Sequence, residues 1–246
     1  MAQQSATEPQ IDNPPLQFGL LLYPGFTLVD LAGPQTAFGF HGVTHLIAKT
    51  MEPVPTDMGV SMNPTTTFAE APETLDVLFV PGGLGTNGTL KDEETLAFLA
   101  RAGARSRYVT SVCTGSAVLG MAGLLDGYRA ATHWAYYDAL TALGIEISPE
   151  RVVVDRNRIT GGGATAGLDF GLTVIAELKG VDAAEFTQLA MEYDPKPPFD
   201  SGHPTKARPE IVELISGSDG VMAGITKEAV EIVTAHRARR AEIAGA

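Results

Sequence analysis

Short, continuous apolar runs alternate along this chain with longer segments that show helical spacing. An apolar run of four to six residues that ends in turn residues is typical of a strand buried on both faces of a sheet. Strands that alternate with helices form a mostly parallel sheet covered by helices on both sides. The chain is therefore expected to be an α/β protein. Its clearest strand candidates are Gln17–Leu22, Val43–Ala48, Asp76–Val80 and Tyr108–Val112.

The order of the expected elements resembles a flavodoxin-like sandwich. The chain has no internal repeat and no long linker, so residues 16–246 are expected to form a single domain with a helical tail from about residue 205. The first fifteen residues are polar and lack both a basic start and an apolar stretch. They are therefore interpreted as a disordered leader and not as a secretory signal.

Charge and composition exclude several functional classes. The chain carries 17 Lys and Arg residues against 29 Asp and Glu residues, a net charge of −12, which argues against a nucleic-acid partner. The apolar stretches are far shorter than the ~20 residues of a membrane span, so no membrane partner is expected. A single Cys excludes an internal disulfide framework and a multi-cysteine zinc site. A cytoplasmic location is expected.

The most informative segment is the strand Tyr108–Val112, which runs directly into Cys113 and a helix that starts at Thr114. This pattern is typical of a nucleophile elbow, in which the side chain after the strand projects above the sheet. A helix N-terminus favours a thiolate, so a lowered thiol pKa is expected. Small residues at positions 115–117 would let helix and strand pack closely. The alternative is that Cys113 is a small buried apolar residue.

A reacting centre also needs hydrogen-bond donors for developing negative charge. Gly82 and Gly83 follow a neighbouring strand, and glycines let the backbone approach a ligand closely. Their amides and the amide of Thr114 are therefore candidate oxyanion and substrate donors. The alternative for Gly82 and Gly83 is an ordinary tight turn.

The candidate proton donor is Asp30, which follows the first strand and has apolar neighbours on both sides. A buried carboxyl has a raised pKa and can shuttle a proton to or from a nearby sulfur. The alternative is that Asp30 only favours a helix N-terminus. None of the five histidines is a convincing base or metal ligand: His41 and His45 straddle a loop and a strand, His133 is a packing or capping residue, and His203 and His236 are solvated.

Several motifs, taken together, resemble the isocyanide hydratases, a branch of the ThiJ/PfpI superfamily with a class I glutamine-amidotransferase-like fold. The resemblance covers about residues 17–240. Members of that branch have an Asp at a position where most of the superfamily has a Glu, and this chain has Asp30 at the matching position. The motifs are Leu28–Pro34, Pro81–Gly83, Ser111–Ser116, Gly123–Gly127, Ala131–Trp134, Gly161–Asp169 and Pro197–Asp200.

The resemblance implies a specific reaction. Cys113 attacks the terminal carbon of an isocyanide to form a thioimidate, Asp30 positions and protonates, and Thr114 helps to hold Asp30 and the intermediate. Water then releases an N-substituted formamide. The resemblance further implies no metal or organic cofactor, a small-molecule substrate and a homodimer.

Two other functional classes stay open. Certain transcription regulators carry an N-terminal ligand-sensing domain with a similar Cys-Thr-Gly elbow, but those chains continue into a helix-turn-helix region of ~100 residues. Here only 46 residues follow Asp200. The other class comprises cysteine-based stress sensors and glyoxalase-like enzymes of the same superfamily, which usually keep Glu at the position of Asp30.

Overall fold

A seven-stranded sheet forms the centre of the computed structural model, which describes residues 14–244. Every pairing in this sheet is parallel except that of its edge strand β10 with β11. The predicted α/β fold with a mostly parallel sheet is therefore confirmed. In spatial order the strands are β10 (Val152–Asp155), β11 (Arg158–Gly161), β7 (Tyr108–Val112), β6 (Val77–Val80), β1 (Leu16–Leu21), β2 (Gly42–Ala48) and β5 (Thr66–Thr67).

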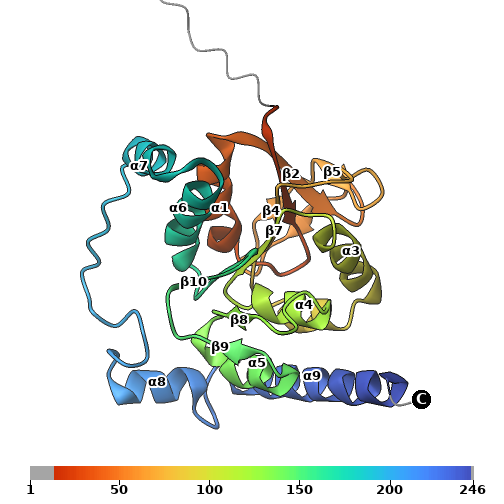
Figure 1. Cartoon of the computed structure of the whole chain (residues 1–246). Coiled ribbons are helices and arrows are strands. Elements are labelled where there is room, and N and C mark those ends of the chain that lie inside the picture. Colours follow the sequence, from red (N-terminus) through yellow and green to blue (C-terminus); the bar gives the residue numbers. More distant parts are fainter. Residues whose placement is uncertain (1–13, 245–246) are drawn as a thin grey trace, which may run out of the picture.

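Helices cover both faces of this sheet (Figure 1). One layer contains α1 (Leu28–Gly39), α6 (Ala166–Lys179) and α7 (Val181–Ala190), which pack against one another in that order. The other layer contains α2 (Thr86–Leu90), α3 (Glu93–Gly103), α4 (Gly115–Met121) and α5 (Tyr137–Leu143). Across residues 14–244, no helix combines the length and apolar character needed to cross a membrane.

Two small ribbons and a short 3-10 helix complete the α/β part. β3 (Val54–Pro55) pairs antiparallel with β4 (Ser61–Met62), and β8 (Arg129–Ala130) pairs parallel with β9 (Glu146–Ile147). The first ribbon is a short antiparallel hairpin. The 3-10 helix η1 (Trp134–Tyr136) leads into α5.

Four phenylalanines join the sheet to the layer that contains α1 and α6. Phe18 of β1 stacks on Phe38 of α1 with ring centroids 4.6 Å apart, and Phe79 of β6 lies 5.5 Å from Phe170 of α6. All four are fully buried. Burying such rings removes a large apolar area from water, so this cluster fixes how α1 and α6 lie on the sheet.

Pro34 does not break the first helix, although a proline inside a helix often does. α1 continues through it, and the proline ring packs against α6 at Gly167, where an added Cβ would lie 3.1 Å from the ring. A proline inside a helix removes one backbone hydrogen bond. Here the close packing of α1 on α6 compensates for that loss.

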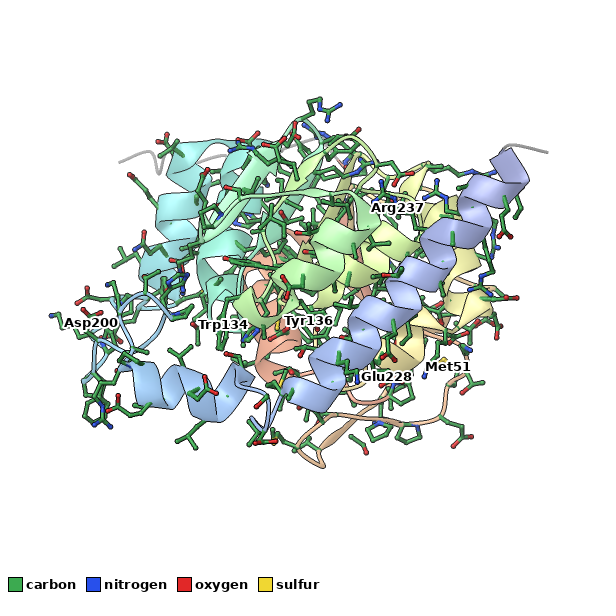
Figure 2. All side chains as sticks on the ribbon, turned by 90° about the horizontal axis from the view of Figure 1, so that it is seen from below. Met51, Trp134, Tyr136, Asp200, Glu228 and Arg237 are labelled. Carbon is green, nitrogen blue, oxygen red and sulfur yellow. The ribbon has the colours of Figure 1, made fainter. Side chains whose placement is uncertain are left out.

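The C-terminal tail is helical and crosses the end of the molecule. A long loop descends from α7 to α8 (Pro209–Ser216), and α9 (Ala223–Ala244) then runs beneath α5 (Figure 1). Ala229 and Val233 of α9 are fully buried. Figure 2 shows Glu228 and Arg237 along α9, and Arg237 donates a 3.2 Å hydrogen bond to the carbonyl of Ala142 in α5. Of the predicted disordered leader, residues 1–13 lie outside the described part of the chain.

The strand order places a functional site at the middle of the sheet. From β1 the sheet extends to β2 on one side and to β6 and β7 on the other. Ligands of open α/β sheets bind beyond the carboxyl ends of the strands where the order reverses in this way. Asp30, Gly82 and Cys113 follow β1, β6 and β7 respectively, so all three lie at this edge.

Candidate active site

Cys113 occupies a strained backbone position between β7 and α4. Its φ is 56°, in the left-handed region that residues other than glycine seldom adopt. Its amide donates to the carbonyls of Gly161 (3.1 Å) and Gly162 (2.6 Å). Its carbonyl accepts from the Thr132 hydroxyl (2.8 Å) and the His133 amide (3.2 Å). Four hydrogen bonds from two neighbouring segments therefore hold the elbow in place.

Glycines allow the elbow to lie directly against β6. A Cβ added to Gly82 would clash with the amide nitrogen of Thr114 and lie 2.7 Å from the Cβ of Cys113. One added to Gly115 would lie 2.7 Å from the carbonyl oxygen of Pro81. The expected close packing at the start of α4 is therefore present.

Asp30 lies in the first turn of α1 and is fully buried. Its Oδ2 accepts a 2.8 Å hydrogen bond from the Gly82 amide, whereas its Oδ1 has no hydrogen-bond partner within residues 14–244. Burial raises the pKa of this carboxyl to about 6, opposed by the Gly82 amide and the nearby Cys113 thiol, while the charge of Asp57 raises it further. The carboxyl is thus held by one oxygen, and it lies next to the sulfur.

The Cys113 side chain is 7% exposed, and burial raises the pKa of its thiol well above the ordinary value. The charge of Asp30 raises it too, while the amide and hydroxyl of Thr114 lower it. The expectation of a lowered thiol pKa is therefore wrong, because burial outweighs the amide at the start of the short helix α4. Near neutral pH the pair holds one proton, mainly on sulfur, beside an ionised Asp30.

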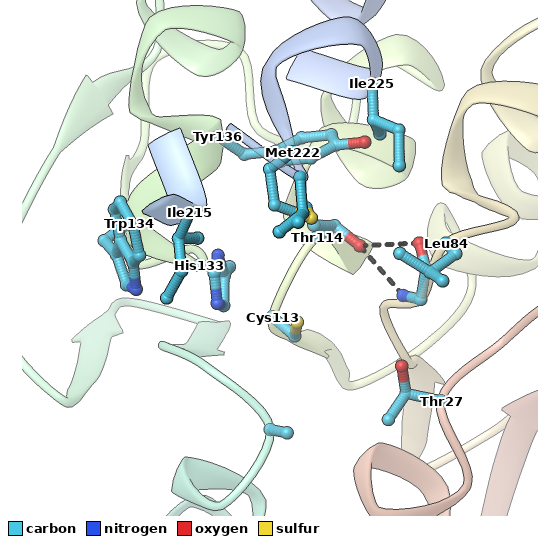
Figure 3. A pocket seen from close by; sticks show the side chains of 13 residues that line it. Thr27, Leu84, Cys113, Thr114, His133, Trp134, Tyr136, Ile215, Met222 and Ile225 are labelled. Atoms are coloured by element: carbon cyan, nitrogen blue, oxygen red, sulfur yellow. Dashed lines mark hydrogen bonds between the residues drawn. The ribbon is translucent and has the colours of Figure 1, made fainter. Parts of the chain in front are cut away.

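The amides of Gly82 and Gly83 both already have acceptors within the protein. Gly82 donates to Asp30, and Gly83 donates to the Thr114 hydroxyl at 2.9 Å (Figure 3). A substrate oxygen or nitrogen could use either amide only by displacing its present acceptor. In this arrangement the two amides position Asp30 and Thr114. The Thr114 hydroxyl is bonded to Gly83 and Thr86, and it makes no hydrogen bond to Asp30 within the described residues.

A cavity of about 380 Å³ opens above Cys113, with Thr27, Thr114, His133 and Tyr136 in its lining. Figure 3 shows Cys113 between Thr27 and the side chains of the tail. The rest of the wall is apolar, which suits a ligand with a hydrocarbon group. The large apolar side chains in the wall are Leu84, Trp134, Ile215, Val221, Met222 and Ile225.

Asn87 of α2 holds the C-terminal tail at the cavity through hydrogen bonds to α9. Its side-chain amide donates to the Ile225 carbonyl and to the Glu228 carboxylate, both at 2.9 Å. Its oxygen accepts from the Tyr136 hydroxyl at 3.0 Å. Sequence reasoning missed these residues, as it missed helix α2 itself. No local signal could have identified them, because the contacts join segments far apart in the chain.

His41, His45 and His133 behave as expected, whereas His236 was wrongly expected to be solvated, because its Nε2 is buried and has no hydrogen-bond partner within residues 14–244. His133 Nδ1 accepts from the Ala135 amide at the start of η1, so the capping interpretation is confirmed, and its ring also lines the cavity. Burial lowers its pKa. His41 bonds to Thr187 and His45 to Gln17, so the two do not form a pair. Within residues 14–244, no three His, Cys, Asp or Glu side chains gather closely enough to hold a metal ion.

Comparisons with known proteins support the same reading of the fold. The model of the DJ-1/PfpI family matches residues 19–177, more than half of the chain. An isonitrile hydratase of Pseudomonas putida is 50% identical over 200 residues, which are 80% of this chain and 87% of that protein. The crystal structure of a ThiJ/PfpI family protein from Pseudomonas syringae matches with a TM-score of 0.82 and 42% identity, over 96% of this chain and 97% of that one.

A second kind of relative is regulatory. The HTH-type transcriptional regulator GbdR of Pseudomonas aeruginosa is 32% identical over 182 residues, which cover 70% of this chain. The same match covers 49% of the regulator. This chain therefore resembles about half of that protein.

Proposed function

This chain belongs to the DJ-1/PfpI family, and we propose that it is an enzyme that adds water to isonitriles, also called isocyanides, to give N-substituted formamides. The observation that carries the proposal is the fully buried carboxyl of Asp30 beside the Cys113 thiol, where each group shifts the pKa of the other. The nucleophile lines the cavity, and the proton carrier lies buried behind it. The 50% identity to an isonitrile hydratase supports this reaction over others that such a pair could catalyse.

In the first step, the S–H group of Cys113 adds to the terminal carbon of the isonitrile. Asp30 takes the thiol proton as the sulfur attacks, and then gives it to that carbon, whose lone pair forms the new C–H bond. The product is a thioimidate, in which the carbon bears hydrogen and sulfur and is doubly bonded to nitrogen. No group leaves in this step, which explains why one shared proton is sufficient.

In the second step, water adds to the carbon of the C=N bond. Asp30 accepts one proton from the water and passes it to nitrogen, so the adduct is neutral and Asp30 is ionised again. The C–S bond then breaks, the hydroxyl becomes the formyl carbonyl, and the released proton restores the Cys113–Asp30 pair. The net change is the addition of one water to one isonitrile, with no redox step.

The other predicted site residues act on this pair. Gly82 orients Asp30, and Gly83 orients the Thr114 hydroxyl, which with the Thr114 amide lies against the sulfur. The apolar wall of the cavity favours isonitriles that carry alkyl or cycloalkyl groups. No metal or organic cofactor has a part in the proposed reaction.

Assembly and location are part of the same proposal. As in the family that its sequence resembles, the chain is proposed to act as a homodimer, and to act in the cytoplasm, where a single reduced Cys is stable. Light scattering that gives 25.8 kDa over a wide concentration range would contradict the dimer.

A comparison of substrates tests the activity. Purified protein is incubated with cyclohexyl isocyanide and, separately, with methylglyoxal, and products are followed by mass spectrometry. Formamide should accumulate from the isocyanide, and the formyl oxygen should carry the label in H₂¹⁸O. Turnover of methylglyoxal without turnover of several isocyanides would instead favour a glyoxalase-like enzyme.

A further inference from the structure

A chain of buried hydroxyl groups leads away from the catalytic cysteine. The Thr114 and Thr86 oxygens are 2.6 Å apart, the Thr86 and Tyr23 oxygens are 3.2 Å apart, and the Tyr23 hydroxyl donates to the Pro81 carbonyl at 3.0 Å. Tyr23, Thr86 and Thr114 are at most 4% exposed. The proposed reaction gives a role to Thr114 and none to Tyr23 or Thr86.

The direction of the protons in this chain follows from its last member. A carbonyl oxygen only accepts, so the Tyr23 proton points to Pro81, and Tyr23 must accept from Thr86. The single Thr86 proton is then used, so Thr86 accepts from Thr114 at 2.6 Å, a much shorter contact than the 3.4 Å one between the Thr114 hydroxyl and the Gly83 carbonyl. The Thr114 proton is thereby directed away from the sulfur of Cys113.

We propose that Tyr23 and Thr86 are positioning residues that hold the Thr114 hydroxyl proton away from the resting thiol and release it toward the sulfur when the sulfur becomes negatively charged. In the reversed chain, Tyr23 donates to Thr86, Thr86 donates to Thr114, and Thr114 donates to the Cys113 thiolate. The three protons only rotate about their oxygens, so no covalent bond is made or broken.

The two orientations contain the same number of hydroxyl hydrogen bonds. The resting orientation has three neutral bonds, and the reversed one has two neutral bonds and one to a charged sulfur. The Gly83 amide donates to the Thr114 oxygen in both. A bond to an ionised acceptor is stronger than a neutral one, so the reversed chain is favoured only while the thiolate exists. The gain is reduced by the bond that Tyr23 gives up at the Pro81 carbonyl.

The expected change in the pKa of the Cys113 thiol is opposite in sign to the one that loss of a hydrogen-bond donor usually causes. Removing the Thr86 or Tyr23 hydroxyl frees the Thr114 proton from its acceptor chain and leaves it only the long 3.4 Å contact with the Gly83 carbonyl. Thr114 can then donate to the thiolate without costing the Tyr23–Pro81 bond, which Thr86→Val keeps and Tyr23→Phe has already removed. Either variant should therefore lower the pKa of the Cys113 thiol, although each deletes a polar group from a buried network.

The charged groups around the sulfur stay the same in these variants, because Tyr23→Phe removes only a hydroxyl that is neutral. Asp30 faces it from α1 and Tyr136 from η1, while Tyr23 itself faces it from the loop after β1; His133 lines the same cavity. Burial raises the pKa of Tyr23 well above its ordinary value, so its proton is retained through the titration.

The test is a titration of Cys113, the single Cys of the chain, by its far-ultraviolet thiolate absorbance. Because the six tyrosines also absorb there when ionised, the spectrum of Cys113→Ser in the same background is subtracted at each pH. The variants are Thr86→Val and Tyr23→Phe, which keep side-chain shape, and Thr86→Ser, which keeps the hydroxyl. Thr110→Val is the matched control, because it removes a buried hydroxyl that donates to the Leu78 carbonyl on the adjacent strand, outside this chain of hydroxyls.

Thr86→Val and Tyr23→Phe should each lower the midpoint by about 0.5–1 pH unit, which is the scale of one neutral hydrogen bond and a ~3- to 10-fold rise in thiolate at fixed pH. Thr86→Ser and Thr110→Val should match the unsubstituted protein. The double variant Thr86→Val/Thr114→Val should not show the lowered midpoint, because it lacks the Thr114 hydroxyl that would donate to the thiolate.

An unchanged or raised midpoint in both Thr86→Val and Tyr23→Phe, with thermal unfolding showing a folded protein, would overturn the inference. So would a lowered midpoint that persists in the double variant. The inference rests on the proposed function only in taking Cys113 as the nucleophile. The titration needs no isonitrile, so a lack of turnover and a failed titration are separate results.

Discussion

The amide of Gly82 donates a 2.8 Å hydrogen bond to one oxygen of the Asp30 carboxyl and leaves the other oxygen without a partner. Asp30 follows β1 and Gly82 follows β6, so this bond joins the two central strands at the point where the strand order reverses. Because Gly82 also packs against the Cβ of Cys113, one residue sets the position of both the carboxyl and the thiol.

Replacing the nucleophile should abolish formamide production. Cys113→Ser and Cys113→Ala remove the sulfur on which the thioimidate forms, and neither introduces a group of comparable nucleophilicity. Mass spectrometry of rapidly quenched, unsubstituted protein should show Cys113 carrying the mass of one isonitrile. Formamide formation that survives in Cys113→Ala would exclude covalent catalysis.

Asp30→Asn should retain binding and lose rate. The Asn oxygen can still accept from Gly82, but the side chain cannot take and return a proton, so kcat should fall by ~10²–10⁴-fold. KM should change much less than kcat, because the apolar wall of the cavity is intact. Steady-state kinetics with cyclohexyl isocyanide measure both constants, and a kcat close to that of the unsubstituted protein would show that protons move by another route.

The same variant should be more stable than the unsubstituted protein at pH 8. Burial raises the pKa of Asp30 from 3.8 to about 6. The folded protein therefore binds this proton more tightly than the unfolded chain, and stability falls as pH rises from about 4 to about 6. The shift corresponds to ~3 kcal/mol of lost stability above that window. In urea unfolding, the free energy of unfolding of Asp30→Asn should exceed that of the unsubstituted protein by more at pH 8 than at pH 4. An equal difference at the two pH values would contradict the raised pKa of Asp30.

Gly82→Ala should impair both folding stability and activity. Its Cβ would clash with the Thr114 amide, and overpacking of this kind costs about 1–3 kcal/mol. The control is Gly88→Ala in helix α2, where an added Cβ meets nothing within 4 Å. That control should gain up to ~1 kcal/mol, since alanine is the better helix former. Similar effects of the two substitutions on thermal unfolding would mean that the elbow can move away from β6.

Met222→Ala should change substrate preference and leave the chemistry intact. Met222 comes from the tail and forms part of the apolar wall, so its loss should favour bulkier isonitriles over smaller ones by up to ~10-fold in relative kcat/KM. Met51→Ala serves as the control, because Met51 is 52% exposed and lies outside the cavity lining. Equal preferences in the two variants would place the hydrocarbon group elsewhere.

Local sequence determined the sheet and indicated the candidate reacting groups. The apolar runs that became β1, β2, β6 and β7 were recognisable because strands buried on both faces need continuous apolar residues. Cys113 was recognisable because a strand that ends in Cys and a following run of small residues form a local pattern. Asp30, Gly82 and Gly83 could be placed at the same edge because parallel strands bring their carboxyl ends together.

Tertiary structure alone decided what these groups do. The thiol pKa is raised because burial and the charge of Asp30 outweigh a local helix amide, and burial is a property of the whole fold. The amides of Gly82 and Gly83 donate hydrogen bonds to Asp30 and Thr114, and these bonds form only because the strands lie side by side. The tail residues Ile215, Met222 and Ile225 enter the cavity wall because α9 packs beneath α5, which no spacing in the sequence encodes. Local pattern fixes backbone conformation, whereas solvation and long-range contacts fix chemistry, and these exist only once the chain is folded.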